Sequence, residues 1–283
     1  MPVKHAKQDR ILIDLFLSAY EDDAWADSKR DYLEERMDGA VEVLATKTDG
    51  VTLAIEHTLI EPFVGDTEDL VRFQKSFLGI EQDKSLIMAG HAIYVDVPVQ
   101  QLEKRQRAPA VVALHAWLKA NIASLPVGRS RRDCQFVVAG NVKGVLPLEI
   151  RVEPLFDPEG ILLIRRYGEE KVGDSVEKAL RAKLPKLAGT KADKRVLLLE
   201  RNQMRLSELD ILDEIEKRKA QFPCLSDVHE IWIAETVFGA DRYVGFKMYM
   251  NGKLVRTLEF REGRLFAKSV NGFPVMMPKP RAR

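Results

Sequence analysis

The sequence predicts an α/β fold, in which helices cover a sheet of partly parallel strands. Two short apolar segments, 195–200 and 230–235, are separated by a helical pattern capped by Ser207. Apolar strands joined by a helix favour parallel pairing in a sheet that is covered on both faces. Near the N-terminus, apolar residues at helical spacing predict an amphipathic helix over residues 8–20.

A β-hairpin is expected between residues 37 and 63. Two apolar runs, 40–45 and 51–55, flank the pair Asp49-Gly50. An Asp-Gly pair between two apolar runs is a strong short-range hairpin signal.

We expect one α/β domain over residues 1–240, with an inserted segment at about 100–170. Three short strand patterns in that segment lack long helices between them, which predicts an antiparallel β-rich insertion. Residues 241–283 are expected to form a C-terminal hairpin through Asn251-Gly252 and a basic tail, packed on the same domain.

Composition narrows the classes of function. The chain has 283 residues and is 46% hydrophobic, so it can bury a substantial core. Lys and Arg number 44 against 43 Asp and Glu, so nucleic-acid binding would need a local basic patch. Two cysteines without metal-ligand spacing and no apolar segment of roughly 20 residues favour a cytoplasmic protein with no membrane partner. The chain lacks a Gly-Lys-Ser/Thr loop, which argues against nucleotide hydrolysis.

The hairpin is expected to bring two carboxylates together. Asp38 lies where its first strand starts and Glu56 where its second strand ends, so antiparallel pairing places them side by side. Such carboxylates repel each other unless a hard cation binds between them, which predicts a Mg²⁺ or Mn²⁺ site. Since side chains alternate across a strand, Thr58 shares the face of Glu56, whereas His57 points to the other face.

These residues resemble the PD-(D/E)XK nuclease superfamily, in which a helix precedes an Asp at one strand start and a Glu-X-Lys motif ends the next strand. The corresponding motifs are Met37-Asp38 and Glu56-His57-Thr58, and the resemblance is most specific over residues 8–75. It implies a restriction-endonuclease-like mixed sheet flanked by helices. It also implies hydrolysis of nucleic-acid phosphodiesters, with DNA as the expected substrate.

The resemblance also implies the roles of individual residues. Asp38 and Glu56 would hold the metal, and Glu21, at the end of the first helix, would add a further acid. Thr58 departs from the pattern, because it occupies the lysine position and a hydroxyl carries no positive charge. Lys183 is the candidate to replace that lysine; it lies on a helix expected over 175–187.

The helix that carries Lys183 is strongly basic. Its start, from Asp174 to Glu177, has the form of a capping box. Residues 178–195 contain seven basic residues and one acid, a local stripe that could follow a phosphate backbone. The candidate nucleic-acid contacts are Lys178, Arg181 and Lys186.

Two alternatives remain open at this point. Thr58 in the lysine position favours a degenerate nuclease fold that binds nucleic acid or protein without cleaving it. The C-terminal hairpin, with Phe246, Tyr249 and Leu258, could instead form the interface of a homo-oligomer.

Overall fold

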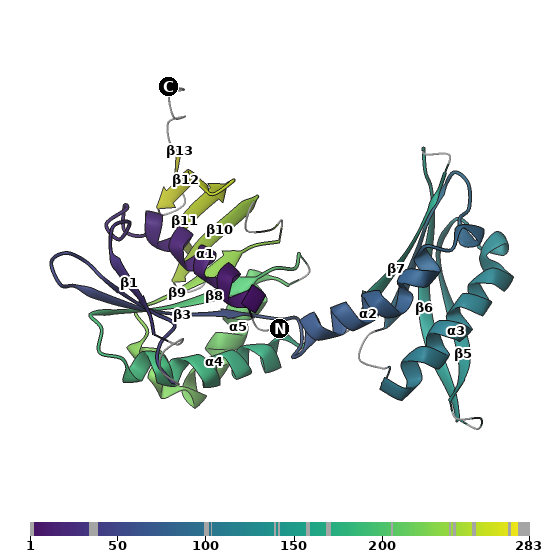
Figure 1. The fold of residues 1–283 in the computed structure, drawn as a ribbon, viewed down its shortest axis with the longest axis horizontal. Helices are drawn as coiled ribbons and strands as arrows, with labels where there is room; N and C mark the ends of the chain where they lie inside the picture. The colour runs from purple at the N-terminus through teal and green to yellow at the C-terminus, as the bar shows by residue number, and fades with distance from the viewer. Residues whose placement is uncertain are drawn as a thin grey trace. The chain divides into compact units, whose positions relative to one another are not determined.

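The chain forms an α/β protein with mixed sheets, divided into two compact units (Figure 1). Residues 1–64 and 171–283 form the main unit, and residues 65–170 form the inserted unit. The structure, a computed structural model, describes residues 3–33, 39–98, 102, 104–138, 140, 142–156, 159–167, 171–204, 206–237, 239, 242–250, 253–270 and 273–276.

Nine described strands form the sheet of the main unit. In sheet order they are β1 (Lys29–Tyr32), β2 (Val43–Thr46), β3 (Thr52–Leu59), β8 (Lys194–Arg201), β9 (Glu230–Glu235), β10 (Tyr243–Met250), β11 (Lys253–Arg261), β12 (Arg264–Val270) and β13 (Phe273–Met276). Parallel pairing joins β3 to β8 and β8 to β9, and the other neighbours are antiparallel. The parallel pairing predicted for the apolar segments at 195–200 and 230–235 is therefore confirmed.

Helices cover both faces of this sheet (Figure 1). Helix α1 (Val3–Ala19) lies on one face, and α4 (Val172–Gly189) and α5 (Glu208–Arg218) lie on the other. Short 3₁₀ turns, η3 (Lys219–Gln221) and η4 (Pro223–Asp227), follow α5. Alternation along the strands separates two cores: Ile55 packs on the α1 side, whereas Ala54 packs on the side of α4 and α5.

The predicted hairpin is formed by β2 and β3. The Lys47 N–H donates to the Val51 carbonyl at 2.9 Å, and Gly50 has a φ of 91°. Glycine adopts this left-handed conformation without the cost that a Cβ would add. The register pairs Val43 with Ile55. Continued by one residue, it sets position 42 opposite position 56.

Helix α4 begins earlier than its sequence pattern predicts. Its first residue is Val172 and its N-cap is Lys171, without a side-chain cap hydrogen bond. The predicted capping box is therefore wrong, because Asp174 and Ser175 lie inside the first turn. Pro185 does not end the helix, which continues to Gly189.

The inserted unit contains its own sheet and helices. Its elements are α2 (Asp66–Glu81), η1 (Lys84–Leu86), β4 (His91–Pro98), α3 (Lys104–Asn121), η2 (Ile122–Ser124), β5 (Gly128–Val138), β6 (Val142–Pro154) and β7 (Ile161–Tyr167). The order is β5-β6-β4-β7, and β4 pairs with β7 in parallel. The expected antiparallel insertion is thus a mixed sheet, because α3 and the β5–β6 hairpin separate these two strands in the chain. The unit begins at Gly65 rather than at about 100.

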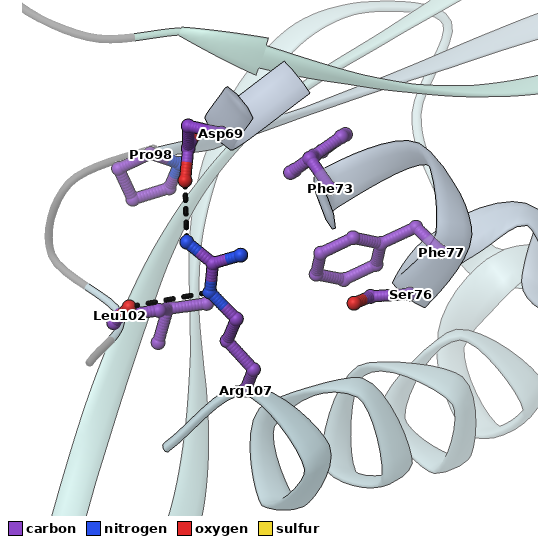
Figure 2. A pocket seen from close by; sticks show the side chains of 7 residues that line it. All are labelled: Asp69, Phe73, Ser76, Phe77, Pro98, Leu102 and Arg107. Atoms are coloured by element: carbon purple, nitrogen blue, oxygen red, sulfur yellow. Dashed lines mark hydrogen bonds and ion pairs between the residues drawn. The ribbon is translucent and has the colours of Figure 1, made fainter. Parts of the chain in front are cut away.

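Ion pairs stabilise the start of α2 in the inserted unit. Arg166 on β7 contacts the fully buried Asp66 at 2.7 Å and Asp69 at 3.3 Å. Figure 2 shows Arg107 of α3 reaching Asp69 and the Leu102 carbonyl. The pocket beside this arginine is about 10 Å³, no larger than one water requires. We assign these residues to the stability of the unit.

The C-terminal strands belong to the main unit. The predicted hairpin is formed by β10 and β11, and β12 and β13 extend it. Phe246 and Leu258 pack in the core beneath α1. In the described part of the chain, no helix is long and apolar enough to cross a membrane.

Candidate functional site

Strand β3 places Glu56 at the centre of the site. The side chain is fully buried on the face that α4 covers. Its Oε1 accepts a hydrogen bond of 2.9 Å from the Glu42 backbone N–H. A buried carboxylate needs charged or polar partners. Glu56 is therefore unlike an ordinary solvent-exposed glutamate at the end of a strand.

Glu42 is the carboxylate that the structure brings beside Glu56. It directly precedes β2, and its Oε2 accepts a hydrogen bond of 3.1 Å from the His57 backbone N–H. Each glutamate therefore accepts a backbone bond from the strand of the other. Sequence reasoning missed Glu42, although a signal was present: it is the single acid in the apolar run 40–45.

Lys183 completes a cluster with these two acids, named here the Glu-Glu-Lys cluster. Its Nζ lies 2.8 Å from Glu56 Oε2 and 3.9 Å from Glu42 Oε2. The side chains of Lys183 and Glu42 are only 15% and 14% exposed. The sequence hypothesis that a lysine from the later helix reaches the hairpin thus has the geometry it requires.

Burial shapes the acid-base behaviour of the cluster. Burial raises the pKa of the Glu42 carboxyl above its ordinary value, and the charge of Glu56 acts in the same direction. The charges of His57 and Lys183 and the backbone hydrogen bond from His57 oppose this rise in pKa. Acids whose pKa is raised by burial beside charged groups are often found in functional sites.

Thr58 lies two residues after Glu56, on the same face of β3. It lines a hollow of about 110 Å³ between the end of β3 and α4. The other lining residues are Leu59, Glu61, Ser175, Lys178, Ala179 and Ala182. The hollow therefore adjoins the Glu-Glu-Lys cluster along both β3 and α4.

The His57 side chain lies away from the cluster. Its Nε2 is 3.1 Å from Glu200 Oε2, and the Thr236 hydroxyl donates to the other Glu200 oxygen. Both His57 and Glu200 are buried. The prediction that His57 points to the opposite face from Glu56 is consistent with these contacts.

Two further residues, Asp38 and Glu21, were predicted as metal ligands. Asp38 lies outside the described residues. Glu21 contacts Lys194 at the start of β8 and lies 3.7 Å from Lys47, which follows β2. Glu21 therefore lies at the end of the sheet where β3 and β8 begin. The first residue of β3, Thr52, precedes Glu56 by four residues.

The basic residues predicted on α4 divide into two sets. At about 100° per residue, Lys178 and Lys186 lie on the side of the helix that carries Ser175 and Ala182. Arg181 lies well away from this side, pairs with Glu177 at 2.8 Å and stacks over the Phe222 ring. The helix geometry therefore favours Lys178 and Lys186 over Arg181 as contacts near the cluster.

No group of three or more His, Cys, Asp or Glu side chains is arranged to hold a metal ion among the described residues. Comparisons of the chain with protein-family models, with curated proteins and with solved structures found no match. The function must therefore be argued from the site itself.

Proposed function

We propose that this protein is a divalent-metal-dependent nuclease with a divergent restriction-endonuclease-like core in its main unit. The Glu-Glu-Lys cluster carries the proposal. It combines two carboxylates on adjacent strands with a lysine from the helix that covers them. This is the chemistry that the resemblance to PD-(D/E)XK nucleases requires, with Glu42 in the role expected of Asp38.

Glu42 and Glu56 would hold the metal, Mg²⁺ or Mn²⁺. Mg²⁺ is commonly bound by one or two carboxylates, with waters and substrate phosphates as its other ligands, so two acids suffice. The backbone bonds at 2.9 and 3.1 Å hold one oxygen of each glutamate in place. A metal at this position supplies charge stabilisation and a bound water of lowered pKa.

The residues of the chain would orient and neutralise the substrate. Lys183 carries the positive charge that Thr58 lacks, and its position beside Glu56 allows it to stabilise negative charge that develops on a phosphate. The Thr58 hydroxyl, on the same face of β3, can hydrogen-bond a water or a phosphate oxygen. Lys178 and Lys186 would contact the phosphate backbone of the nucleic acid, with DNA as the proposed substrate of this cytoplasmic enzyme.

Mn²⁺ binding and cleavage test the proposal together. We expect the wild type to bind Mn²⁺ by isothermal titration calorimetry and to degrade DNA or RNA only with Mg²⁺ or Mn²⁺. Glu56→Gln should lose both properties. Lys183→Met should keep Mn²⁺ binding and lose cleavage by about a hundredfold or more, because only transition-state charge stabilisation is removed.

The matched control is Glu216→Gln, which neutralises an acid that is 73% exposed on α5. It should behave like the wild type in both assays. Equal degradation by the wild type and Glu56→Gln would exclude the enzyme and leave the alternative of a binding module.

A further inference from the structure

One residue that lines the hollow beside the cluster carries a buried polar group for which the described residues provide no partner. Ser175 is 7% exposed, and its buried hydroxyl finds no hydrogen-bond partner among the described residues. A buried hydroxyl left unpaired costs about 1–3 kcal/mol, so such a group calls for an explanation. Ser175 lines the hollow of about 110 Å³, which we name the Ser175 hollow.

The lining of this hollow favours an acceptor-rich ligand. Of its four polar side chains, Ser175, Thr58 and Lys178 can donate hydrogen bonds, and Glu61 can only accept when ionised. A phosphate group offers several acceptor oxygens to such donors. The ammonium of Lys178 would add a charge-assisted bond.

The hollow lies next to the Glu-Glu-Lys cluster at a distance that suits neighbouring phosphates. Thr58 follows Glu56 by two residues on one face of β3, a separation of about 6.6 Å. Neighbouring phosphates along one strand of nucleic acid are separated by a similar distance. On α4, Ala182 of the lining directly precedes Lys183.

We propose that the Ser175 hollow binds the phosphate next to the scissile phosphate, with Ser175, Thr58 and Lys178 as its donors. This inference rests on the proposed function, because the Glu-Glu-Lys cluster defines which phosphate is scissile. The negative charge of an ionised Glu61 would repel the phosphate. Its neutralisation should therefore strengthen binding, whereas loss of a donor should weaken it.

The first test measures binding in EDTA, where cleavage does not occur. Fluorescence polarisation with a labelled single-stranded DNA oligonucleotide should show Ser175→Ala and Lys178→Ala binding about three- to tenfold more weakly. Lys178→Ala should also lower the salt slope by about one. Glu61→Gln should bind more tightly.

The control and a stability measurement separate this role from misfolding. Lys217→Ala removes the same charge from α5, where Lys217 is 65% exposed, and should bind as the wild type does. Ser175→Ala removes an unpaired buried hydroxyl, so its melting temperature should equal or exceed that of the wild type. Unchanged affinity and salt slope in Lys178→Ala would overturn the inference.

The second test uses cleavage. A neutral methylphosphonate replaces the phosphate next to the scissile bond, on each side in turn. On the side that the hollow binds, the substitution should lower kcat/KM of the wild type about tenfold. It should lower kcat/KM of Lys178→Ala by less than about twofold, because this variant has already lost the interaction between Lys178 and that phosphate. Equal losses in both proteins would contradict the subsite.

The two proposals can fail separately. If the wild type binds DNA but does not cleave it, the nuclease proposal fails and the binding measurements alone decide on the Ser175 hollow. If DNA does not bind in EDTA, the phosphate subsite is excluded, even where metal-dependent cleavage is found.

Discussion

At the scale of single residues, the site depends on two glutamates that face each other across a strand pair. Glu56 is fully buried and the Glu42 side chain is only 14% exposed, and Lys183 lies beside both carboxylates. Two acids and one base leave the cluster one negative charge in excess when all three are ionised. Burial of two carboxylates side by side is unfavourable for folding, and a divalent cation between them would relieve this cost.

Glu42→Gln should stabilise the fold while it abolishes cleavage. The raised pKa of Glu42 means that its ionised form opposes folding at neutral pH, and a glutamine can still accept the His57 N–H bond. We expect the melting temperature in EDTA to rise by about 2 °C. Differential scanning calorimetry measures the shift, and the exposed variant Glu216→Gln should show none. A clear fall in the melting temperature would contradict this account of Glu42.

At the scale of secondary-structure elements, a second charged network joins α5 to the sheet. Glu208 in the first turn of α5 lies 2.6 Å from Lys247 on β10 and 3.1 Å from Arg201 on β8. Glu235 on β9 contacts the same two bases, at 3.1 and 2.7 Å. Acids and bases balance here, unlike in the Glu-Glu-Lys cluster, so we assign this network to stability.

The Glu208 network should make stability depend on pH. Burial opposes ionisation, but the hydrogen bonds from Lys247 and Tyr249 and the charges of Lys247 and Arg201 together outweigh it and lower the pKa of Glu208. An acid with a lowered pKa contributes stability above its unfolded pKa, ordinarily 4.5, and this contribution is lost as the pH falls through the folded pKa.

Urea unfolding at several pH values measures that contribution. Glu208→Gln should lower the free energy of unfolding by about 2 kcal/mol at pH 7. The difference from the wild type should shrink at acidic pH. A difference that stays constant below the ordinary pKa of a glutamate would show that Glu208 acts through packing and not through its charge.

The C-terminal strands also act at this scale. Phe246 is fully buried, and the centroid of its ring lies 5.4 Å from that of the Phe16 ring. Phe246 and Leu258, two of the side chains that suggested an oligomer interface, are both used in this core. Phe246→Ala should cost about 3–4 kcal/mol in urea unfolding. Sedimentation should show no change in mass; a change of mass with little loss of stability would favour the interface.

At the scale of the whole molecule, the chain builds the main unit from two separated segments and the inserted unit from the continuous segment between them. Residues 65–170 separate β3 from α4, although Glu56 and Lys183 of these elements are in contact. The residues of the Glu-Glu-Lys cluster therefore come from both sides of the inserted unit in the sequence. Each unit has its own sheet, so we expect each to respond separately to mutation.

Arg166→Ala should destabilise the inserted unit alone. The substitution leaves Asp66 buried without this ion pair, which costs about 3 kcal/mol or more. Hydrogen exchange followed by mass spectrometry should show faster exchange in peptides from 65–170. Peptides from β3, β8 and α4 should be unchanged, and equal acceleration in both units would contradict their independence.

The sequence by itself determined the features that depend on local pattern. Two apolar runs and the Asp49-Gly50 pair between them predicted the hairpin, and strand alternation separated the faces of Glu56 and His57. The helix between two apolar strands predicted their parallel pairing. These are properties of neighbouring residues, set by strand and helix periodicity and by turn geometry.

Only the tertiary structure decided which side chains meet. The strand register places Glu42 opposite Glu56, a contact that the sequence pattern did not single out. Lys183 was the candidate named among several lysines on its helix, and the packing of α4 on β3 places it against Glu56. Asp174 was expected to cap that helix, and the next residue, Ser175, lies inside the helix and lines a hollow. Such contacts join residues far apart in the chain, so their choice depends on packing and register rather than on local sequence.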